Sequence, residues 1–172
     1  SAVRIAVRLM VGSATRRKQL RINAMDTAVS TVIKDMHSYE PANGHGLKHD
    51  PFNALIAPRP IGWMATRGAK GNINLAPYSF FNAFNYKPPI LGFSSTGWKD
   101  TVRNIEETGE FTWNLCTMPL AEAMNITSAG VPPDVSEFET SGLTPVPSRL
   151  VKVPRVGEAR AAMELKLIKI MQ

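Results

Sequence analysis

The segment Pro60–Thr66 constrains the fold more than any other part of the chain, because its residues alternate with a period of two. One set of alternate positions is Ile61, Trp63 and Ala65, and the other is Gly62, Met64 and Thr66. Successive side chains of a β-strand point to opposite faces, so this pattern predicts a strand in a two-layered or closed sheet. The polar stretch 67–72 follows, and Ile73–Leu75 resumes the extended pattern, which predicts a β-hairpin.

The rest of the chain predicts a mostly β domain with helices inserted between strands. Further strands are predicted over Ile90–Phe93, Phe111–Cys116, Val151–Val156 and Met163–Met171. A short helix is predicted over Lys99–Thr108, ended by Gly109, and a second over Pro119–Ser128. The proline-rich stretch 129–147 is predicted to be a long surface excursion. Because strands and helices do not alternate regularly, the pattern favours a barrel or sandwich over a doubly wound sheet.

The net charge of +6 is concentrated at the start of the chain. Residues 1–24 hold six arginines and lysines and no acidic residue, whereas the remainder holds fourteen basic and fourteen acidic residues. Residues 1–24 are therefore predicted to be a basic leader, and residues 25–172 a single domain. The leader is either transit-like or non-native sequence upstream of a start at Met25. The balanced domain argues against a nucleic-acid partner, and no stretch is long and apolar enough to predict a membrane span.

Cys116 is the single cysteine, so a disulfide within the chain is excluded. A cytoplasmic location is expected by default, with organellar import if residues 1–24 are native. The alternating apolar pattern around Cys116 predicts a small core or interface residue rather than a catalytic thiol.

Motifs for other chemistries are missing from the sequence. His45 and His49 are four residues apart, but glycines flank His45, and a structural zinc needs four ligands, so no metal site is predicted. The chain lacks the dinucleotide-binding, Walker, zinc-protease and nucleophile-elbow motifs. No residue is assigned a catalytic acid, base or nucleophile role.

The segment Ser94–Thr101 brings several hydroxyls, a glycine and Lys99 to the start of a predicted helix. Unpaired N–H groups and the helix dipole favour an anion at a helix N-terminus, and Lys99 adds a full positive charge. Ordinary N-capping would need one hydroxyl only. The segment predicts either a phosphate site or a capped helix start within a polar loop.

The segment Asn74–Asn82 combines small residues with aromatic ones. Ala76 and Ser79 would let a flat ring approach the backbone, and Asn74 or Asn82 would hydrogen-bond its carbonyl groups. The alternative is that the aromatic residues belong to the core. Taken alone, the pattern favours core over cofactor wall.

The strongest combined signal lies in four segments, which are Ala57–Thr66, Asn74–Asn82, Lys87–Pro89 and Lys99–Ile105. In order and spacing they resemble the flavin reductase-like proteins with an FMN-binding split barrel. The resemblance implies a six-stranded Greek-key barrel that forms a homodimer, with FMN near the subunit interface. By position, it implies that Trp63, Met64, Ala65 and Thr66 line the isoalloxazine, that Asn74, Ala76, Ser79 and Asn82 surround the ring and ribityl chain, and that Ser94, Ser95, Lys99 and Thr101 hold the phosphate.

The resemblance also implies a reaction, which is hydride transfer from NADH or NADPH to the flavin. The flavin performs this chemistry while the protein supplies position, so a visible acid or base is not expected. The chain is thus predicted to be an NAD(P)H:flavin oxidoreductase that supplies a partner monooxygenase or another electron acceptor. Two alternatives are an FMN-holding electron-transfer protein without reductase turnover and a non-catalytic binding domain. Barrels of the family continue with further strands, so the resemblance implies either that the domain is incomplete at its C-terminal end or that the dimer partner completes the barrel.

Overall fold

The structure is a computed structural model that describes residues 37–172. The predicted leader, residues 1–24, lies outside the described residues. The described residues belong to two units, 37–58 and 59–172. In the first unit, the 3-10 helix η1 spans Pro41–Asn43 and helix α2 spans Pro51–Leu55. Asp50 begins α2, because its carboxylate accepts a hydrogen bond from the backbone N–H of Phe52 at 2.9 Å.

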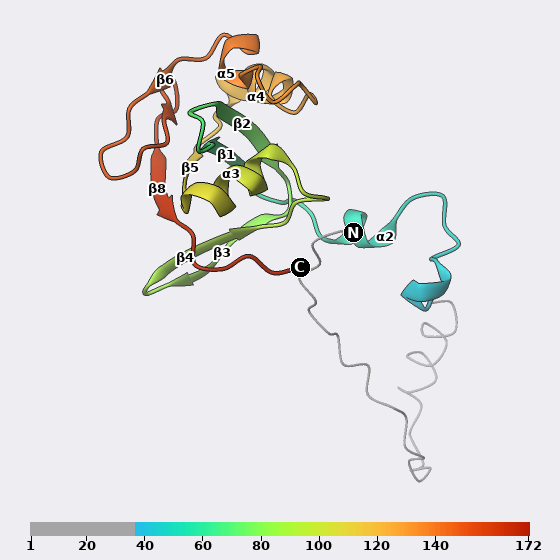
Figure 1. The fold of residues 1–172 in the computed structure, drawn as a ribbon. Helices are drawn as coiled ribbons and strands as arrows, with labels where there is room; N and C mark the ends of the chain where they lie inside the picture. The colour runs from blue at the N-terminus through green and yellow to red at the C-terminus, as the bar shows by residue number, and fades with distance from the viewer. Residues whose placement is uncertain (1–36) are drawn as a thin grey trace, which may run out of the picture. The chain divides into compact units, whose positions relative to one another are not determined.

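The second unit is built around a four-stranded antiparallel sheet with the strand order β2-β1-β5-β8 (Figure 1). Two other strand pairs, β3–β4 and β6–β7, form separate ribbons. The elements are β1 (Gly62–Arg67), β2 (Ile73–Tyr78), β3 (Phe81–Tyr86), β4 (Pro89–Phe93), α3 (Asp100–Thr108), β5 (Glu110–Asn114), η2 (Met118–Leu120), α4 (Ala121–Ile126), α5 (Glu137–Thr140), β6 (Pro145–Val146), β7 (Arg155–Val156) and β8 (Ala162–Lys166). Of the described residues, 22% are helical and 27% lie in strands, which confirms the predicted mostly β class.

Strand β1 lies inside the sheet and is buried on both faces. Its alternation sends Trp63 and Ala65 into one core cluster and Met64 into a second. The hairpin to β2 is confirmed, with Thr66 directly opposite Asn74. The period-two pattern therefore marks a strand between two apolar layers, which is why both sets of alternate positions avoid charge.

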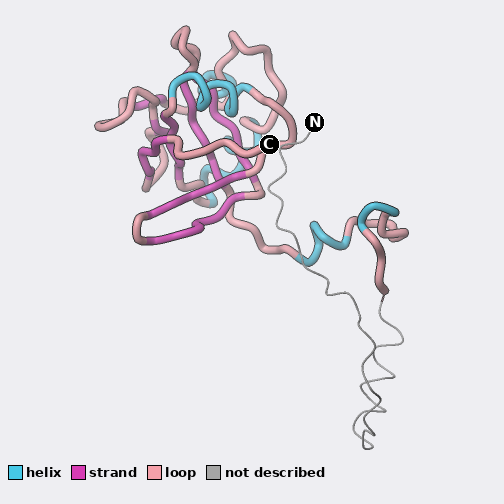
Figure 2. The backbone as a smooth tube through the Cα atoms, turned by 60° about the horizontal axis from the view of Figure 1, so that its bottom comes forward, coloured by secondary structure: helices cyan, strands magenta, loops and turns pink. Residues whose placement is uncertain are grey.

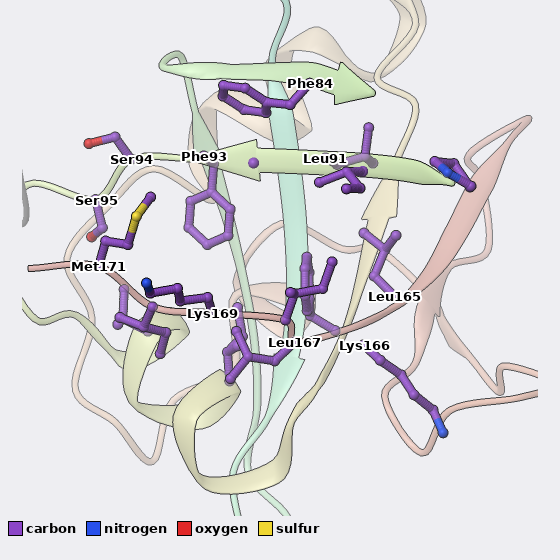
Figure 3. Close-up of a pocket in the computed structure, with 18 residues that line it drawn as sticks. Phe84, Leu91, Phe93, Ser94, Ser95, Leu165, Lys166, Leu167, Lys169 and Met171 are labelled. Carbon is purple, nitrogen blue, oxygen red and sulfur yellow. The ribbon is translucent and has the colours of Figure 1, made fainter. Parts of the chain in front are cut away.

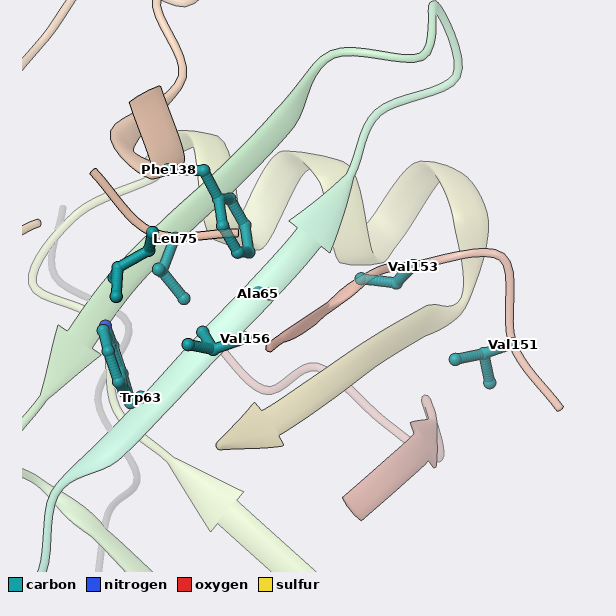
Figure 4. Packing of buried hydrophobic residues seen from close by; sticks show 8 residues of the cluster. Trp63, Ala65, Leu75, Phe138, Val151, Val153 and Val156 are labelled. Atoms are coloured by element: carbon teal, nitrogen blue, oxygen red, sulfur yellow. The ribbon is translucent and has the colours of Figure 1, made fainter. Parts of the chain in front are cut away.

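The first core cluster joins the sheet to segments far along the chain (Figure 4). Its buried members are Trp63, Ala65, Leu75, Phe138, Leu143, Val151, Val153 and Val156. Cys116 is half-buried and packs against this cluster, as predicted for a small core residue. The second cluster contains Met64, Tyr78, Ile105 and Phe111, and α3 supplies Ile105 to it.

Helix α3 confirms the helix predicted over Lys99–Thr108. Val102 and Ile105 are buried on one face, and Gly109 ends the helix in the left-handed conformation with φ of 70°. The N–H of Gly109 donates to the carbonyl of Ile105 at 2.8 Å, which satisfies one of the carbonyl groups left open at the helix end.

The stretch 129–147 is only partly the surface excursion that its prolines predicted. It contains α5, whose Phe138 is 1% exposed and belongs to the first core cluster. The predicted strands at 151–156 and 163–171 are also shorter, as β7 covers Arg155–Val156 and β8 ends at Lys166. Val151 and Val153 are buried, but the N–H of Val151 donates to the carboxylate of Glu164 rather than to a strand.

The ribbon β3–β4 extends as a long hairpin apart from the four-stranded sheet (Figure 2). Its register shifts between Ala83 and Asn85, and the side chains of Phe84 and Tyr86 are 64% and 79% exposed. Within residues 59–172, strand-pairing hydrogen bonds do not join the four-stranded sheet to either ribbon. The closed six-stranded arrangement implied by the resemblance thus stays a prediction.

Candidate functional site

The corner formed by Ser94–Thr101 follows β4 and leads directly into α3. The backbone N–H of Ser94 donates to the carbonyl of Phe80 at 2.9 Å, which ties the corner to the start of β3. In the ribbon, Phe81 faces Phe93 and Asn82 faces Gly92. The fold therefore brings two predicted site segments, around Ser79–Asn82 and around Ser94, to the same end of the ribbon.

The N-terminus of α3 carries no side-chain cap. Lys99 occupies the N-cap position, and its exposed side chain makes no capping hydrogen bond. The hydroxyl of Ser95 instead donates to the carbonyl of Gly97 at 2.9 Å, and that of Thr101 donates to Oδ1 of Asn74 at 2.7 Å. Of the two alternatives for this segment, simple capping by a serine or threonine is therefore wrong. A helix start without a side-chain cap and with an ammonium group beside it is a feature that favours anions.

A buried polar network lies behind this corner. The carboxylate of Glu137 accepts from Nδ2 of Asn74 at 2.7 Å and from the N–H of Leu75 at 2.9 Å. Oδ1 of Asn74 accepts from the hydroxyls of Thr101, at 2.7 Å, and of Thr66, at 3.3 Å. Nδ2 of Asn104 then donates to the Thr66 hydroxyl at 3.1 Å. Three of the predicted residues, Thr66, Asn74 and Thr101, thus form one connected group.

Burial raises the pKa of Glu137, and the hydrogen bonds that its carboxylate accepts from Leu75 and Asn74 oppose the rise. Glu137 is 5% exposed, so its carboxylate has exchanged water for the N–H donors of β2. A buried carboxylate of this kind holds the Asn74 amide in one orientation, with its nitrogen toward Glu137 and its oxygen toward Thr101.

Tyr78, the last residue of β2, is 7% exposed and lies beside Thr101 and Ser95. Its ring packs against Phe93, with 4.6 Å between the ring centroids. Burial raises the pKa of Tyr78, and the neighbouring hydroxyls of Thr101 and Ser95 oppose the rise. The Tyr78 hydroxyl is therefore buried beside the hydroxyls of Thr101 and Ser95.

The predicted ring end divides into a buried and an exposed part. The side chains of Trp63, Met64, Ala65 and Thr66 are all fully buried. Nε1 of Trp63 donates to the hydroxyl of Thr127 at 2.9 Å. Ala76 is half-buried, whereas Ser79 and Asn82 are exposed. The assignment of these residues to a flavin ring stays a prediction, and only the last two present their side chains to solvent.

An apolar pocket of about 340 Å³ begins at this corner (Figure 3). Ser94 and Ser95 line one end, and β4, α3 and the segment 165–171 form the walls. The remaining lining is largely aliphatic and aromatic, including Leu91, Phe93 and Leu167. Its volume lies within the range of small-molecule pockets.

The fold brings most of the predicted residues to one region but uses their side chains unequally. Sequence reasoning missed the roles of Asn104 and Glu137, which complete the polar network, whereas the core position that the aromatic pattern favoured for Tyr78 is confirmed. Asn104 lies inside a segment that the sequence had singled out, so its position was visible although its role was not. Glu137 lies in the stretch 129–147, where no local signal placed it beside β2.

Three further observations concern residues 37–172. No group of three or more metal-ligating side chains comes together there, and Cys116 is unpaired, with burial raising the pKa of its thiol. None of the helices in this range combines the length and the apolar character that a membrane crossing needs.

Residues 55–172 match the model of the flavin reductase like domain family. An uncharacterized protein of Aquifex aeolicus is 46% identical over 120 residues, which are 67% of this chain and 61% of that protein. The chain spans 58–61% of the length of three curated relatives that it matches.

Two solved structures share the fold. Nitrilotriacetate monooxygenase component B from Bacillus cereus is 35% identical, with a TM-score of 0.71 over 78% of this chain and 69% of that one. A candidate flavin reductase with a split barrel domain from Shewanella frigidimarina is 31% identical, with a TM-score of 0.60 over 63% of this chain and 57% of that one. The predicted split-barrel class is therefore confirmed.

Proposed function

The chain belongs to the flavin reductase-like domain family, and from that membership we propose that it binds FMN and transfers hydride to it from NADH or NADPH. The observation that carries the proposal is the start of α3, which lacks a side-chain cap and is flanked by the exposed ammonium of Lys99. A phosphate monoester is the part of FMN that such a helix start recognises.

The donors at the corner fit a phosphate. The first-turn N–H groups of α3, the Lys99 ammonium and the half-buried hydroxyl of Ser94 are the groups that would hold it. Thr101 contributes its backbone N–H, since its hydroxyl is bonded to Asn74. Ser95 lines the corner, and its hydroxyl is bonded to Gly97.

The ring end is assigned by family membership. We assign direct contact with the ring to Ser79 and Asn82, whose side chains are exposed beside the corner. The strand Trp63–Thr66 supports them from behind, because its side chains are packed in the two cores. Asn74 acts through Thr101, since both polar atoms of its amide are already bonded.

Bound FMN supplies the ring that accepts hydride, and the protein supplies position and exclusion of water. The phosphate anchor fixes one end of the molecule, and the ribbon residues fix the other. Holding nicotinamide against a ring placed in this way provides rate through proximity. No acid or base is required of the chain.

The test is spectroscopic. The purified protein with added FMN should be yellow, and anaerobic addition of NADH or NADPH should bleach it. Yellow protein that neither nucleotide bleaches would instead support the FMN-holding, electron-transfer alternative. Colourless protein that binds no added FMN would contradict both, and would leave the non-catalytic binding domain.

A homodimer and a separate electron acceptor are part of the same proposal. Phe84 and Tyr86 on β3 are exposed aromatic side chains, as a subunit interface would require. The solved relative from Bacillus cereus is a monooxygenase component, which supports a monooxygenase as acceptor. Light scattering tests the first point, because a monomer that bound FMN tightly would contradict an interface site. A cytoplasmic location stays a prediction.

A further inference from the structure

Glu137 is a carboxylate that the protein buries although burial disfavours its charge. It is 5% exposed, and its place is fixed by α5, because the neighbouring Phe138 is packed in the first core cluster. The N–H of Leu75 needs only one acceptor, which the oxygen of a neutral amide would also provide. The second carboxylate oxygen, which contacts Asn74, is the part that an amide could not replace.

The Asn74 amide is held in one orientation by a group that accepts hydrogen bonds and does not donate them. An ionised carboxylate is such a group, so the amide nitrogen faces Glu137 and the amide oxygen faces the opposite way. That oxygen accepts from the hydroxyls of Thr101, at 2.7 Å, and of Thr66, at 3.3 Å. The Asn74 oxygen thereby joins β2 to β1 and to the second residue of α3.

We propose that Glu137 is a positioning residue for the flavin site, because through Asn74 it fixes the direction of the Thr101 hydrogen bond and holds the start of α3 against β2. The inference rests on the proposed FMN site. Glu137 acts at a distance, since Asn74 and Thr101 lie between its carboxylate and the first turn of α3. A binding group is effective when the side chains behind it fix its position. In Glu137→Gln, one amide oxygen would face two donors, so Asn74 would lose its acceptor or turn its nitrogen toward Thr101.

The test exchanges the charge between residues 137 and 74 and measures FMN binding by fluorescence titration. Glu137→Gln should raise the dissociation constant about tenfold, within the roughly hundredfold loss that a misplacement of about 1 Å can cause. Asn74→Asp should also weaken binding, because it sets two carboxylates against each other. The double variant should return the constant close to the wild-type value, because the amide at position 137 then offers its oxygen to Leu75 and its nitrogen to the carboxylate at position 74. Glu139→Gln, an exposed position on the same helix, is the matched control and should change nothing.

Riboflavin separates positioning from a general loss of structure. It lacks the phosphate, so its dissociation constant should change little in all of these variants. Equal weakening of FMN and riboflavin would overturn the inference, as would single variants that bind FMN as tightly as the wild type. A folded double variant that binds FMN no better than the single variants would overturn it too. These outcomes leave the proposed function intact, whereas wild-type protein that binds no FMN would overturn both.

A double-mutant cycle at Thr101 covers a charge-exchanged variant that fails to fold. Thr101→Val removes the hydroxyl that links Asn74 to α3, so adding Glu137→Gln to it should weaken FMN no further. Thr101→Ser keeps a hydroxyl, and adding Glu137→Gln to it should weaken FMN as it does in the wild type. Substitutions that act through one shared contact are not additive. A full additional loss in the Thr101→Val protein would show that Glu137 does not act through Thr101 and would overturn the inference.

Discussion

Two regions of this protein treat backbone N–H groups outside strand pairing in opposite ways. In the segment 144–152, carboxylates accept hydrogen bonds from five backbone N–H groups, so side chains of the protein cap these donors. The donors are Thr144, Arg149, Leu150, Val151 and Lys152, and the acceptors are Glu158 for the first, Glu164 for the next three and Glu110 for the last. At the start of α3, no side chain caps the backbone N–H groups.

The chain therefore has carboxylates that accept hydrogen bonds from backbone N–H groups in one region, but no carboxylate does so at the Ser94–Thr101 corner. Asp100 is the nearest carboxylate there, but it forms an ion pair with Arg103 on the surface of α3. Behind the open start, in contrast, the Glu137 network is fully connected. An open set of donors on a closed, rigid support is what a binding site for an anion requires.

The largest effect should come from removing that support. Glu137→Ala would leave Nδ2 of Asn74 and the N–H of Leu75 buried without an acceptor. We expect the free energy of unfolding to fall by about 3 kcal/mol, since each unsatisfied buried donor costs roughly 1–3 kcal/mol. Urea unfolding measures the change. Glu139→Ala, an exposed glutamate on the same helix, is the control and should leave stability nearly unchanged. Equal effects of the two variants would show that the network does not support the corner.

The next largest effect should come from the uncapped start of α3. Lys99→Ala should weaken FMN about tenfold, because a hydrogen bond to a charged group contributes about 1.5–3 kcal/mol, and should change riboflavin little. Fluorescence titration with both flavins measures the difference. Because Lys99 is exposed, the effect should shrink at high salt. Equal weakening of the two flavins would place the phosphate elsewhere.

A change of pH should alter the stability that the carboxylates of the two regions contribute in opposite directions. Backbone N–H donors from Arg149 and Leu150 lower the pKa of Glu164; at Glu158, burial raises the pKa but hydrogen bonds from Thr144 outweigh it, and the net shift is downward. The stability from these carboxylates is therefore present above the unfolded pKa, about 4.3, and is lost as the pH falls through the folded values. Glu137 behaves oppositely, because its raised pKa means that its contribution is lost as the pH rises through the folded value.

The measurement is urea unfolding at a series of pH values from neutral to acid. Glu164→Gln should flatten the decline on the acid side, and Glu137→Gln should remove the loss that accompanies a rising pH. Parallel curves for both variants and the wild type would show that neither carboxylate titrates differently in the folded protein.

The smallest effect should come from Arg103, which tests whether position or net charge matters at the corner. Arg103→Ala removes one positive charge, as Lys99→Ala does, but its ion pair with Asp100 lies on the exposed side of α3. Stability should change by about 0.5 kcal/mol or less, as for other exposed pairs, and FMN affinity should change far less than in Lys99→Ala. An equal loss of FMN affinity in the two variants would mean that only the summed charge attracts the ligand.

Much of the fold was predictable because it depends on local patterns. The alternation in Pro60–Thr66 marked β1, and the spacing of Val102 and Ile105 before Gly109 marked α3. The family match confirms the resemblance carried by the four segments. The helix α5 was not predictable, because Phe138 stands alone between two glutamates and shows no apolar period. The strand predicted over 151–156 failed for a related reason, since burial of Val151 and Val153 does not require strand pairing.

The sequence by itself determined the mostly β architecture, the family and the two segments, Asn74–Asn82 and Ser94–Thr101, from which a flavin site is proposed. These follow from periodicity, turn residues and motif spacing, which are properties of neighbours along the chain. The tertiary structure alone decided which donors are free. It placed Glu137 against Asn74, so that the Thr101 hydroxyl donates inward to Asn74 and not toward the corner. The direction of a hydrogen bond depends on partners distant in sequence, so only the folded chain reveals it.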